Sequence, residues 1–301
     1  MKLSGRRESS NVDDRRGSSK GKAAGGIGIV GVIVAMLVVY LQGGNPLSVL
    51  SDVGLGTSVS TSVAADGVSS DYQPTAEEER MATICRQILA STEDVWTVKF
   101  REAGLSYQPP TLVLFSESVQ SSCGGATSAV GPFYCSADQC LYIDLSFLLS
   151  MKQSLGVRPS HGKDLFELAY AYVVAHEGGH HVQNLLGTLP KVHERMNSLP
   201  QAQANQLSVR LELQADYLAG VWAAGENELF HSLEDGDVED AISTALVIGD
   251  DYLQKKAQGH AVPESFTHGT AQQRARYLRA GMNGGSIKGA DALFQGRYED
   301  L

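Results

Sequence analysis

The segment His176-Glu177-Gly178-Gly179-His180 constrains the fold of this chain more than any other feature of its sequence. In an α-helix, residues four apart lie on one face, one turn from each other, so both imidazoles can bind a single metal ion. Glu177 is turned by about 100° from the first histidine, so it can reach a metal-bound water rather than the metal. This is the HExxH pattern of zinc hydrolases, in which the glutamate is the general base.

The residues before this motif predict that its histidines face the interior of the protein. An apolar stripe leads to them at steps of four and three residues, formed by Leu165, Ala169 and Tyr172. A helix that runs from a capping-box pattern at Asp164 to near Gly187 would carry this stripe. Gly178 and Gly179 each cost such a helix about 1 kcal/mol relative to alanine. The close approach of another backbone or of a ligand would explain them.

A catalytic zinc ion takes three protein ligands and leaves a fourth position for water. Glu212 is our candidate for the third ligand, on a helix predicted over residues 203–224. The apolar stripe of this helix consists of Leu207, Leu211, Ala215, Leu218 and Trp222. Glu212 and Asp216 lie one turn apart at the flank of that stripe. We expect Glu212 to bind the metal and Asp216 to hold the distal N–H of a ligand histidine.

Two alternatives to this ligand set follow from the same residues. Glu212 and Asp216 could be an exposed acidic pair on an amphipathic helix, with no role at a metal. The third ligand could also be one of four later histidines, which are His193, His231, His260 and His268. The three-histidine pattern HExxHxxGxxH is disfavoured, because Leu186 stands where that pattern needs its third histidine.

A zinc hydrolase also needs a second electrophile, besides the metal, to stabilise the oxyanion that forms during the reaction. We favour His268, because the segment FTHGTAQQR (266–274) joins this histidine to a capped helix start at Thr270. Tyr217 and His231 are the alternatives. A capping or packing role for His268 is an equally open interpretation of the same segment.

Residues Ala23–Leu41 form a run of 19 residues without a charge. About 20 apolar residues span a bilayer, so this run predicts one transmembrane helix. Seven basic residues precede it, and the next Lys or Arg after it is Arg80. The positive-inside rule then places the N-terminus in the cytoplasm and the rest of the chain outside the membrane. No small-x-small site directly follows Leu41, which favours an uncleaved anchor over a signal peptide.

All four cysteines lie beyond the apolar run, and an even number of them in an exported domain predicts disulfides. A bridge between Cys123 and Cys135 would close the loop between them, which is rich in Gly and Ser. Cys85 and Cys140 would form the second bridge. Buried thiols are the alternative, and a zinc site made of cysteines is disfavoured because the chain has no CxxC pair.

The order of these segments predicts the organisation of the chain. A polar, disordered tail (1–22) precedes the transmembrane anchor (23–41) and a flexible linker (42–73), and the folded domain covers residues 74–301. We expect a mainly helical α+β domain with a small sheet. Further helices are predicted over 75–102, 238–257 and 270–280, and strands over 111–115 and 141–145.

Charge and strand position limit the partners of this domain. The net charge of −10 argues against nucleic acid as a partner. The strand predicted over residues 141–145 could bind an extended peptide along its edge, as in other cases of strand addition.

Several blocks of the sequence together resemble the bacterial neutral zinc metallopeptidase family. They are HEGGHHVQ (176–183), ELQAD with AGVWA (212–216 and 219–223), VGPFYC (130–135), YIDLSF (142–147) and FTHGTAQQR (266–274). The N-terminal GRRESSNVDDRRG, followed by a Gly-rich apolar run, is similar to the family as well. Gly178 departs from the family pattern, in which we expect a larger apolar residue.

The resemblance implies a zincin-like fold of the gluzincin type, in which His176, His180 and Glu212 bind one zinc ion and Glu177 is the base. It also implies a peptidase anchored in the bacterial cytoplasmic membrane, with its catalytic domain in the periplasm and peptides or proteins as substrates. Two other functions would use the same residues. One is a non-catalytic scaffold or chaperone with structural zinc, and the other is a zinc amidase that acts on cell-wall fragments.

Overall fold

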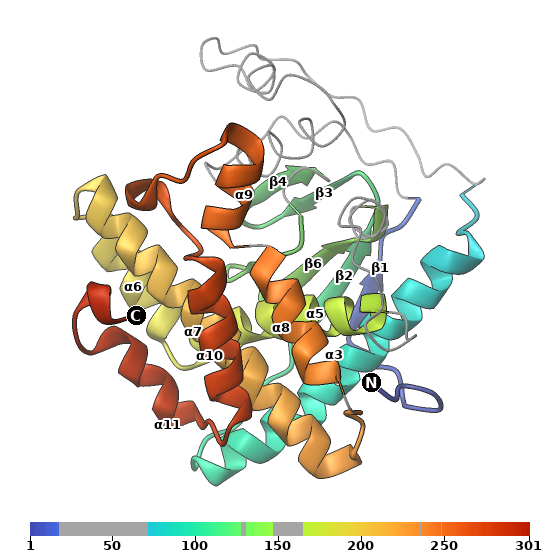
Figure 1. Ribbon diagram of the computed structural model, residues 1–301. Coiled ribbons are helices and arrows are strands. Elements are labelled where there is room, and N and C mark those ends of the chain that lie inside the picture. The colour runs from blue at the N-terminus through green and yellow to red at the C-terminus, as the bar shows by residue number, and fades with distance from the viewer. Residues whose placement is uncertain (18–71, 128–130, 147–164, 235, 248) are drawn as a thin grey trace. The chain divides into compact units, whose positions relative to one another are not determined.

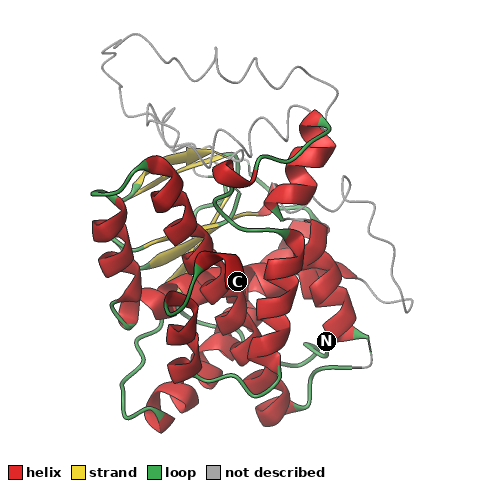
Figure 2. Cartoon of the chain, turned by 60° about the vertical axis from the view of Figure 1, so that its left-hand side comes forward, coloured by secondary structure: helices red, strands yellow, loops and turns green. Residues whose placement is uncertain are grey.

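The computed structural model describes residues 1–17, 72–127, 131–146, 165–234, 236–247 and 249–301. The chain divides into two compact units. We call Met1–Ser10, Ile84–Pro110 and Val157–Leu301 the helical unit, and Asn11–Thr83 with Thr111–Gly156 the sheet unit. The described residues are mostly helical with a small sheet, which confirms the predicted α+β class (Figure 2).

A mixed four-stranded sheet forms the centre of the sheet unit (Figure 1). Its strands, in spatial order, are β1 (Val12–Asp14), β2 (Thr111–Phe115), β6 (Cys140–Asp144) and β5 (Phe133–Cys135). β1, β2 and β6 run parallel to one another, and β5 is antiparallel to β6. A separate antiparallel pair consists of β3 (Ser118–Ser121) and β4 (Gly124–Thr127). β2 and β6 are the two strands that the sequence predicts.

The position of β6 contradicts one expectation from the sequence. Leu141 in β6 pairs with Leu112 of β2 on one side and with Tyr134 of β5 on the other. Because both edges of β6 already pair with neighbouring strands, this strand has no edge to which an extended peptide could add. Its apolar residues are buried, and the Tyr142 ring stacks on Phe133 with centroids 4.7 Å apart.

One of the two predicted disulfides forms in the structure. Cys123 and Cys135 are bridged, which links the turn between β3 and β4 to β5. The predicted bridge between Cys85 and Cys140 is wrong, and both residues remain thiols. Cys140 lies in β6 with its Sγ 3.3 Å from the carbonyl oxygen of Asp138, and Cys85 is buried within a helix.

Helices make up most of the helical unit. They are α5 (Leu165–Leu185), α6 (Thr188–Met196), α7 (Gln201–Phe230), α8 (Asp237–Val247), α9 (Asp250–Gln258), α10 (Ala271–Met282) and α11 (Ile287–Ala290). α3 (Ala76–Glu102) begins in the sheet unit and continues in the helical unit. The predicted capping boxes at Thr75 and Thr270 both form at the helix starts, whereas Asp164 lies outside the described residues.

The single helix predicted over residues 238–257 is wrong, because the chain forms α8 and α9 there instead. Gly249 is the N-cap of α9. A Cβ at this position would lie 2.2 Å from the backbone nitrogen of Ala271, so the break lets the two backbones meet. The backbone N–H of Asp250 also donates to the carbonyl oxygen of Gly269 at 2.9 Å. The break therefore joins the start of α9 to the loop before α10.

α7 lies between α5 and α10 at the centre of the helical unit (Figure 1). The crossing of α7 and α10 depends on two glycines. A Cβ on Gly281 would lie 1.9 Å from the carbonyl oxygen of Tyr217, and one on Gly220 would lie 2.1 Å from that of Leu278. The two helices therefore meet backbone to backbone, which brings the side chains of α10 against the middle of α7.

The N-terminal tail is not disordered over residues 1–17, contrary to the prediction for residues 1–22. Residues 12–14 form β1 in the sheet unit, and Leu3 is buried in the helical unit. Carboxylates in both units pair with the arginines of this segment, which gives it a reason to order. The predicted membrane anchor (23–41) and nearly all of the linker (42–73) lie outside the described residues. None of the described helices is both long enough and apolar enough to cross a membrane.

Candidate metal centre

α5 carries both histidines of the HExxH pattern, as predicted from its apolar stripe. His176 is buried, with 7% of its surface exposed. The rings of His176 and His180 lie one turn apart with centroids separated by 4.9 Å. The two planes are nearly perpendicular, at 87°.

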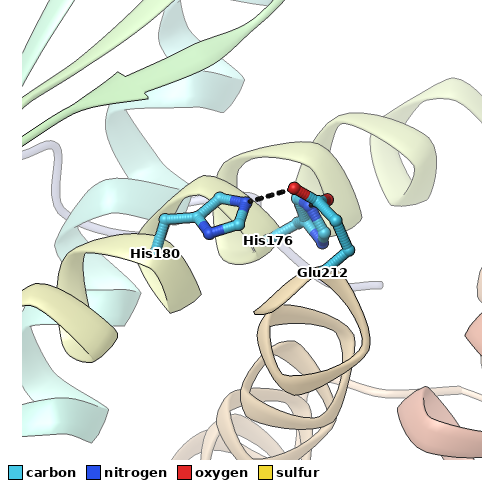
Figure 3. A group of neighbouring side chains, drawn as sticks. All are labelled: His176, His180 and Glu212. Atoms are coloured by element: carbon cyan, nitrogen blue, oxygen red, sulfur yellow. Dashed lines mark hydrogen bonds and ion pairs between the residues drawn. The ribbon is translucent and has the colours of Figure 1, made fainter. Parts of the chain in front are cut away.

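α7 brings Glu212 to these two rings (Figure 3). Its Oε2 lies 3.1 Å from Nε2 of His176, and its Oε1 lies 3.5 Å from Nε2 of His180. One donor atom from each of the three residues lies within 4.8 Å of the other two. Ligands about 2.0–2.2 Å from a tetrahedral zinc are separated by roughly 3.3–3.6 Å, and the distances from Glu212 to the two histidine nitrogens are close to that range.

A buried carboxylate holds His176 from the side opposite Glu212. Oδ1 of Asp216 lies 2.9 Å from Nδ1 of His176, and Asp216 is completely buried. Because a carboxylate accepts hydrogen bonds, it fixes the proton of the ring on Nδ1 and leaves the Nε2 lone pair for a metal. This is the position that the sequence suggested for Asp216.

Asp216 is itself held by groups from two other helices. Arg274 of α10 donates from Nε to Oδ2 at 2.9 Å and from an Nη to Oδ1 at 3.1 Å. The hydroxyl of Tyr172 donates to Oδ1 of the same carboxylate. The bidentate arginine and the tyrosine together fix the carboxylate plane against which His176 is aligned.

Gln183 plays the corresponding part for His180, and the sequence analysis missed it. Its side-chain N–H donates to the carbonyl oxygen of Leu211 at 2.6 Å, so its Oε1 must face His180 Nδ1, 2.9 Å away. This fixes the proton of His180 on Nδ1 and again leaves Nε2 for a metal. The signal was available, because residue 183 lies one turn after residue 180 on the same helix face.

The carboxylates of the site stay ionised at neutral pH. Burial raises the pKa of Glu212, but the nearby His180 and His268 outweigh it and hold this pKa well below its usual range. Burial also acts against the charge of Asp216, but Arg274 and His176 lower its pKa to about 2. Glu212 is therefore available as an anionic ligand.

Glu177 lies between the two histidines in the sequence of α5 and is buried, with 8% of its surface exposed. Within the described part of the chain, its carboxylate has no hydrogen-bond or ion-pair partner. A buried carboxylate beside the ligand cluster and without a competing partner is suited to accept a proton from water.

His268 is held in place by Asp250, which the sequence analysis also missed. Oδ2 of Asp250 accepts the backbone N–H groups of Thr267, His268 and Gly269 at 2.7, 2.6 and 3.2 Å. Its Oδ1 lies 3.2 Å from Nδ1 of the His268 ring. Burial lowers the pKa of His268, but Glu212 and Asp250 outweigh it and raise the pKa. The raised pKa favours the doubly protonated ring, in which Nδ1 faces Asp250 and Nε2 can donate.

The two alternatives to His268 are not suited to an oxyanion. The hydroxyl of Tyr217 accepts the backbone N–H of Ser286 at 2.9 Å and lies 3.2 Å from its carbonyl oxygen. His231 follows the last residue of α7 and is exposed. The helix rises 1.5 Å per residue, so His231 lies roughly 28 Å along the helix axis from Glu212. His193 and His260, the other alternative ligands, are exposed and outside the ligand cluster.

Gly179 sets the distance between the two ligand-bearing helices. A Cβ on Gly179 would lie 2.9 Å from the carbonyl oxygen and 3.0 Å from the Cα of Ala215 in α7. The close backbone approach expected from the sequence is therefore present at Gly179. Gly178 differs, because a Cβ there would meet only Thr92 Cγ2, at 4.0 Å.

The two glycines should respond oppositely to alanine. We expect Gly179→Ala to lower the free energy of unfolding by about 1–3 kcal/mol, because the added methyl pushes α5 away from α7. Gly178→Ala should raise it by up to about 1 kcal/mol, because the methyl fits and the helix gains propensity. Denaturant unfolding of the full chain measures both, and equal effects of the two variants would contradict this assignment.

Asp250 should stabilise the protein in a pH-dependent way. Burial raises its pKa, but His268 and the backbone donors outweigh this and lower it. Its contribution is complete above the unfolded value of about 3.9 and is lost as pH falls through the lower folded value. Asp250→Asn should therefore reduce the free energy of unfolding by roughly 1.5–3 kcal/mol at pH 7, and by less below about pH 4.

The matched control for this experiment is Asp291→Asn, which removes the charge of an exposed aspartate. This control should change the free energy of unfolding by less than about 0.5 kcal/mol at either pH. A difference between wild type and Asp250→Asn that stayed constant from pH 7 to pH 3.5 would show that the ionised carboxylate does not hold the His268 loop.

Comparisons with known proteins identify the family of this chain. The family model described as "Putative neutral zinc metallopeptidase" matches residues 1–293. "Uncharacterized protein YpfJ" of Escherichia coli (strain K12) is 42% identical over 290 residues, which cover 95% of this chain and 96% of the relative. "Uncharacterized protein Rv2575" of Mycobacterium tuberculosis is 35% identical over 256 residues, 81% of each chain. No solved structure matches the chain. The family match spans nearly the whole sequence, so this chain belongs to the neutral zinc metallopeptidase family named by that model.

Proposed function

We propose that this protein is a zinc-dependent peptidase, in which His176, His180 and Glu212 hold one zinc ion and Glu177 is the general base. The observation that carries the proposal is the convergence of three ligand atoms within 4.8 Å on α5 and α7. Family membership supports the class of reaction and the metal. The arrangement is that of a gluzincin, with a glutamate as the third ligand.

A zinc ion at this site would lower the pKa of a water and polarise the scissile carbonyl. Glu177 accepts the proton of the attacking water and delivers it to the leaving amine. His268 donates from Nε2 to the oxyanion, since Asp250 occupies the Nδ1 side of its ring. Asp216 and Gln183 hold the two ligand histidines in the tautomer that leaves Nε2 for the metal.

Metal content and peptide cleavage by the full chain test this proposal together. His176→Ala and Glu212→Ala should each lose bound zinc. Glu177→Gln should keep the zinc and the fold, while cleavage of a fluorogenic peptide library falls by roughly 10²–10⁴-fold, because only the proton acceptor is lost. Glu194→Gln is the matched control, since it removes an exposed carboxylate from α6 and should leave both readouts unchanged.

Two results would contradict the proposal in different ways. Full cleavage by Glu177→Gln would mean that this carboxylate is not the base. Bound zinc without cleavage of any peptide by the wild-type protein would favour the scaffold with structural zinc, or an amidase with another substrate.

The proposal includes attachment to the bacterial cytoplasmic membrane. The support comes from the sequence, in which residues 23–41 carry no charge and match the length of a bilayer span. The predicted topology, with a cytoplasmic N-terminus and a periplasmic catalytic domain, depends on a single crossing by this run.

A further inference from the structure

The first ten residues are docked on the helical unit by their backbone and by a buried side chain. The backbone N–H of Lys2 donates to the carbonyl oxygen of Ser232 at 2.8 Å, just after α7. The backbone N–H of Ser9 donates to the carbonyl oxygen of Arg86 in α3 at 3.1 Å. Leu3 lies between these two points and is only 6% exposed. Residues 1–10 therefore follow a defined path over the helices.

An ion pair with a buried carboxylate strengthens this docking. Nη1 of Arg6 lies 2.7 Å from Oε1 of Glu226 in α7, and Glu226 is completely buried. The hydroxyl of Ser91 also donates to this carboxylate, and the Arg6 guanidinium lies 3.7 Å from the centroid of the Phe230 ring. Among the described residues, Arg6 is the cation that pairs with the Glu226 carboxylate, so its removal would leave that buried charge without a counterion from this part of the chain.

The next residues extend the same contact along α3. Arg7 lies 2.9 Å from Glu93 and 2.6 Å from Asp94, and the hydroxyl of Ser9 donates to Glu93 at 2.5 Å. Glu8 pairs with Arg86 at 2.5 Å. Charges of both signs on the N-terminal segment thus meet their opposites on one helix.

The sheet unit holds the end of the segment independently. β1 pairs with β2 over Val12–Asp14, and the backbone N–H of Arg15 continues the ladder to Leu114 at 2.7 Å. Arg16 reaches Glu79 at 2.9 Å. At Gly17 a Cβ would lie 2.4 Å from the Cβ of Tyr72, so residues 17 and 72 are in contact. The residues that flank the segment 18–71 on its two sides therefore lie next to each other.

These contacts give the basic residues before the apolar run a second explanation. Five of the seven pair with carboxylates of the folded protein, and they are Lys2, Arg6, Arg7, Arg15 and Arg16. A charge run that is used in this way no longer requires a membrane-topology role.

We propose that residues 1–17 are a docked part of the folded protein and lie on the same side of the membrane as His176, His180 and Glu212. A single crossing of a hydrocarbon layer about 30 Å thick by residues 23–41 would put Gly17 and Tyr72 on opposite sides of it. It would also separate Arg6 from Glu226 and β1 from β2. On this proposal, the membrane does not separate residues 1–17 from the catalytic residues. This arrangement replaces the topology expected from the sequence, in which they lie on opposite sides.

Labelling of thiols with a membrane-impermeant maleimide tests this arrangement in cells that make the full chain. Ser4→Cys reports on the N-terminal segment and Leu105→Cys on the helical unit, since both positions are exposed. Both are placed in a Cys140→Ser background, which removes the half-buried thiol and leaves Cys85 buried. In intact spheroplasts the maleimide should label both positions or neither, and in lysed spheroplasts it should label both. Labelling of only one position in intact spheroplasts would overturn the proposal.

A charge exchange tests the docking itself in the purified full chain. Arg6→Glu and Glu226→Arg should each lower the Tm by roughly 5–10 °C, and the double variant should recover at least half of that loss. Lys2→Glu is the matched control, because it changes the charge of the same segment equally, while Lys2 is 68% exposed and 3.7 Å from Glu234. An unchanged Tm of Arg6→Glu, or a double variant no more stable than the worse single variant, would show that the segment is not docked.

Discussion

The approach of the Glu212 carboxylate to the rings of His176 and His180 is the interaction on which the site depends. It requires α5 and α7 to pack closer than most side chains allow, and Gly179 against Ala215 provides that distance. The candidate ligands then come from one turn of α5 and from the facing turn of α7, so two long helices hold the donor atoms. Sites built on helices keep their geometry better than sites built on loops.

The two histidines are supported by chemically different partners. An anion, Asp216, backs His176, and a neutral amide, Gln183, backs His180. An imidazole that donates its Nδ1 proton to a carboxylate binds a metal through Nε2 more strongly than one that donates to an amide oxygen. The Nε2 atoms of His176 and His180 are therefore not equivalent. Arg274 and Tyr172 align Asp216, Arg274 also keeps it ionised, and through Arg274 α10 becomes part of the candidate site.

Helical periodicity and capping patterns predicted most of the long helices, and short β-rich runs between turn residues predicted the strands β2 and β6, because those signals are local. The positions of His176 and His180 followed from local spacing, whereas Glu212 was one candidate third ligand among several, chosen from its place on the amphipathic helix that became α7. The roles of Gln183 and Asp250 depend on which atoms meet after α7, α9 and α10 have packed, and composition carries no such information. β1 was missed because a three-residue run with two aspartates carries no strand signal of its own and forms a strand only through its partner β2.

The pairing of Val12 with Leu112 has a consequence for biosynthesis. A ribosome releases β1 long before β2 emerges, because β2 lies far later in the sequence. The first strand must wait with an open edge until its parallel neighbour has been made, and such distant pairing slows folding. The arginines around β1 add charge to that waiting strand, and charge discourages nascent chains from pairing with one another in the meantime.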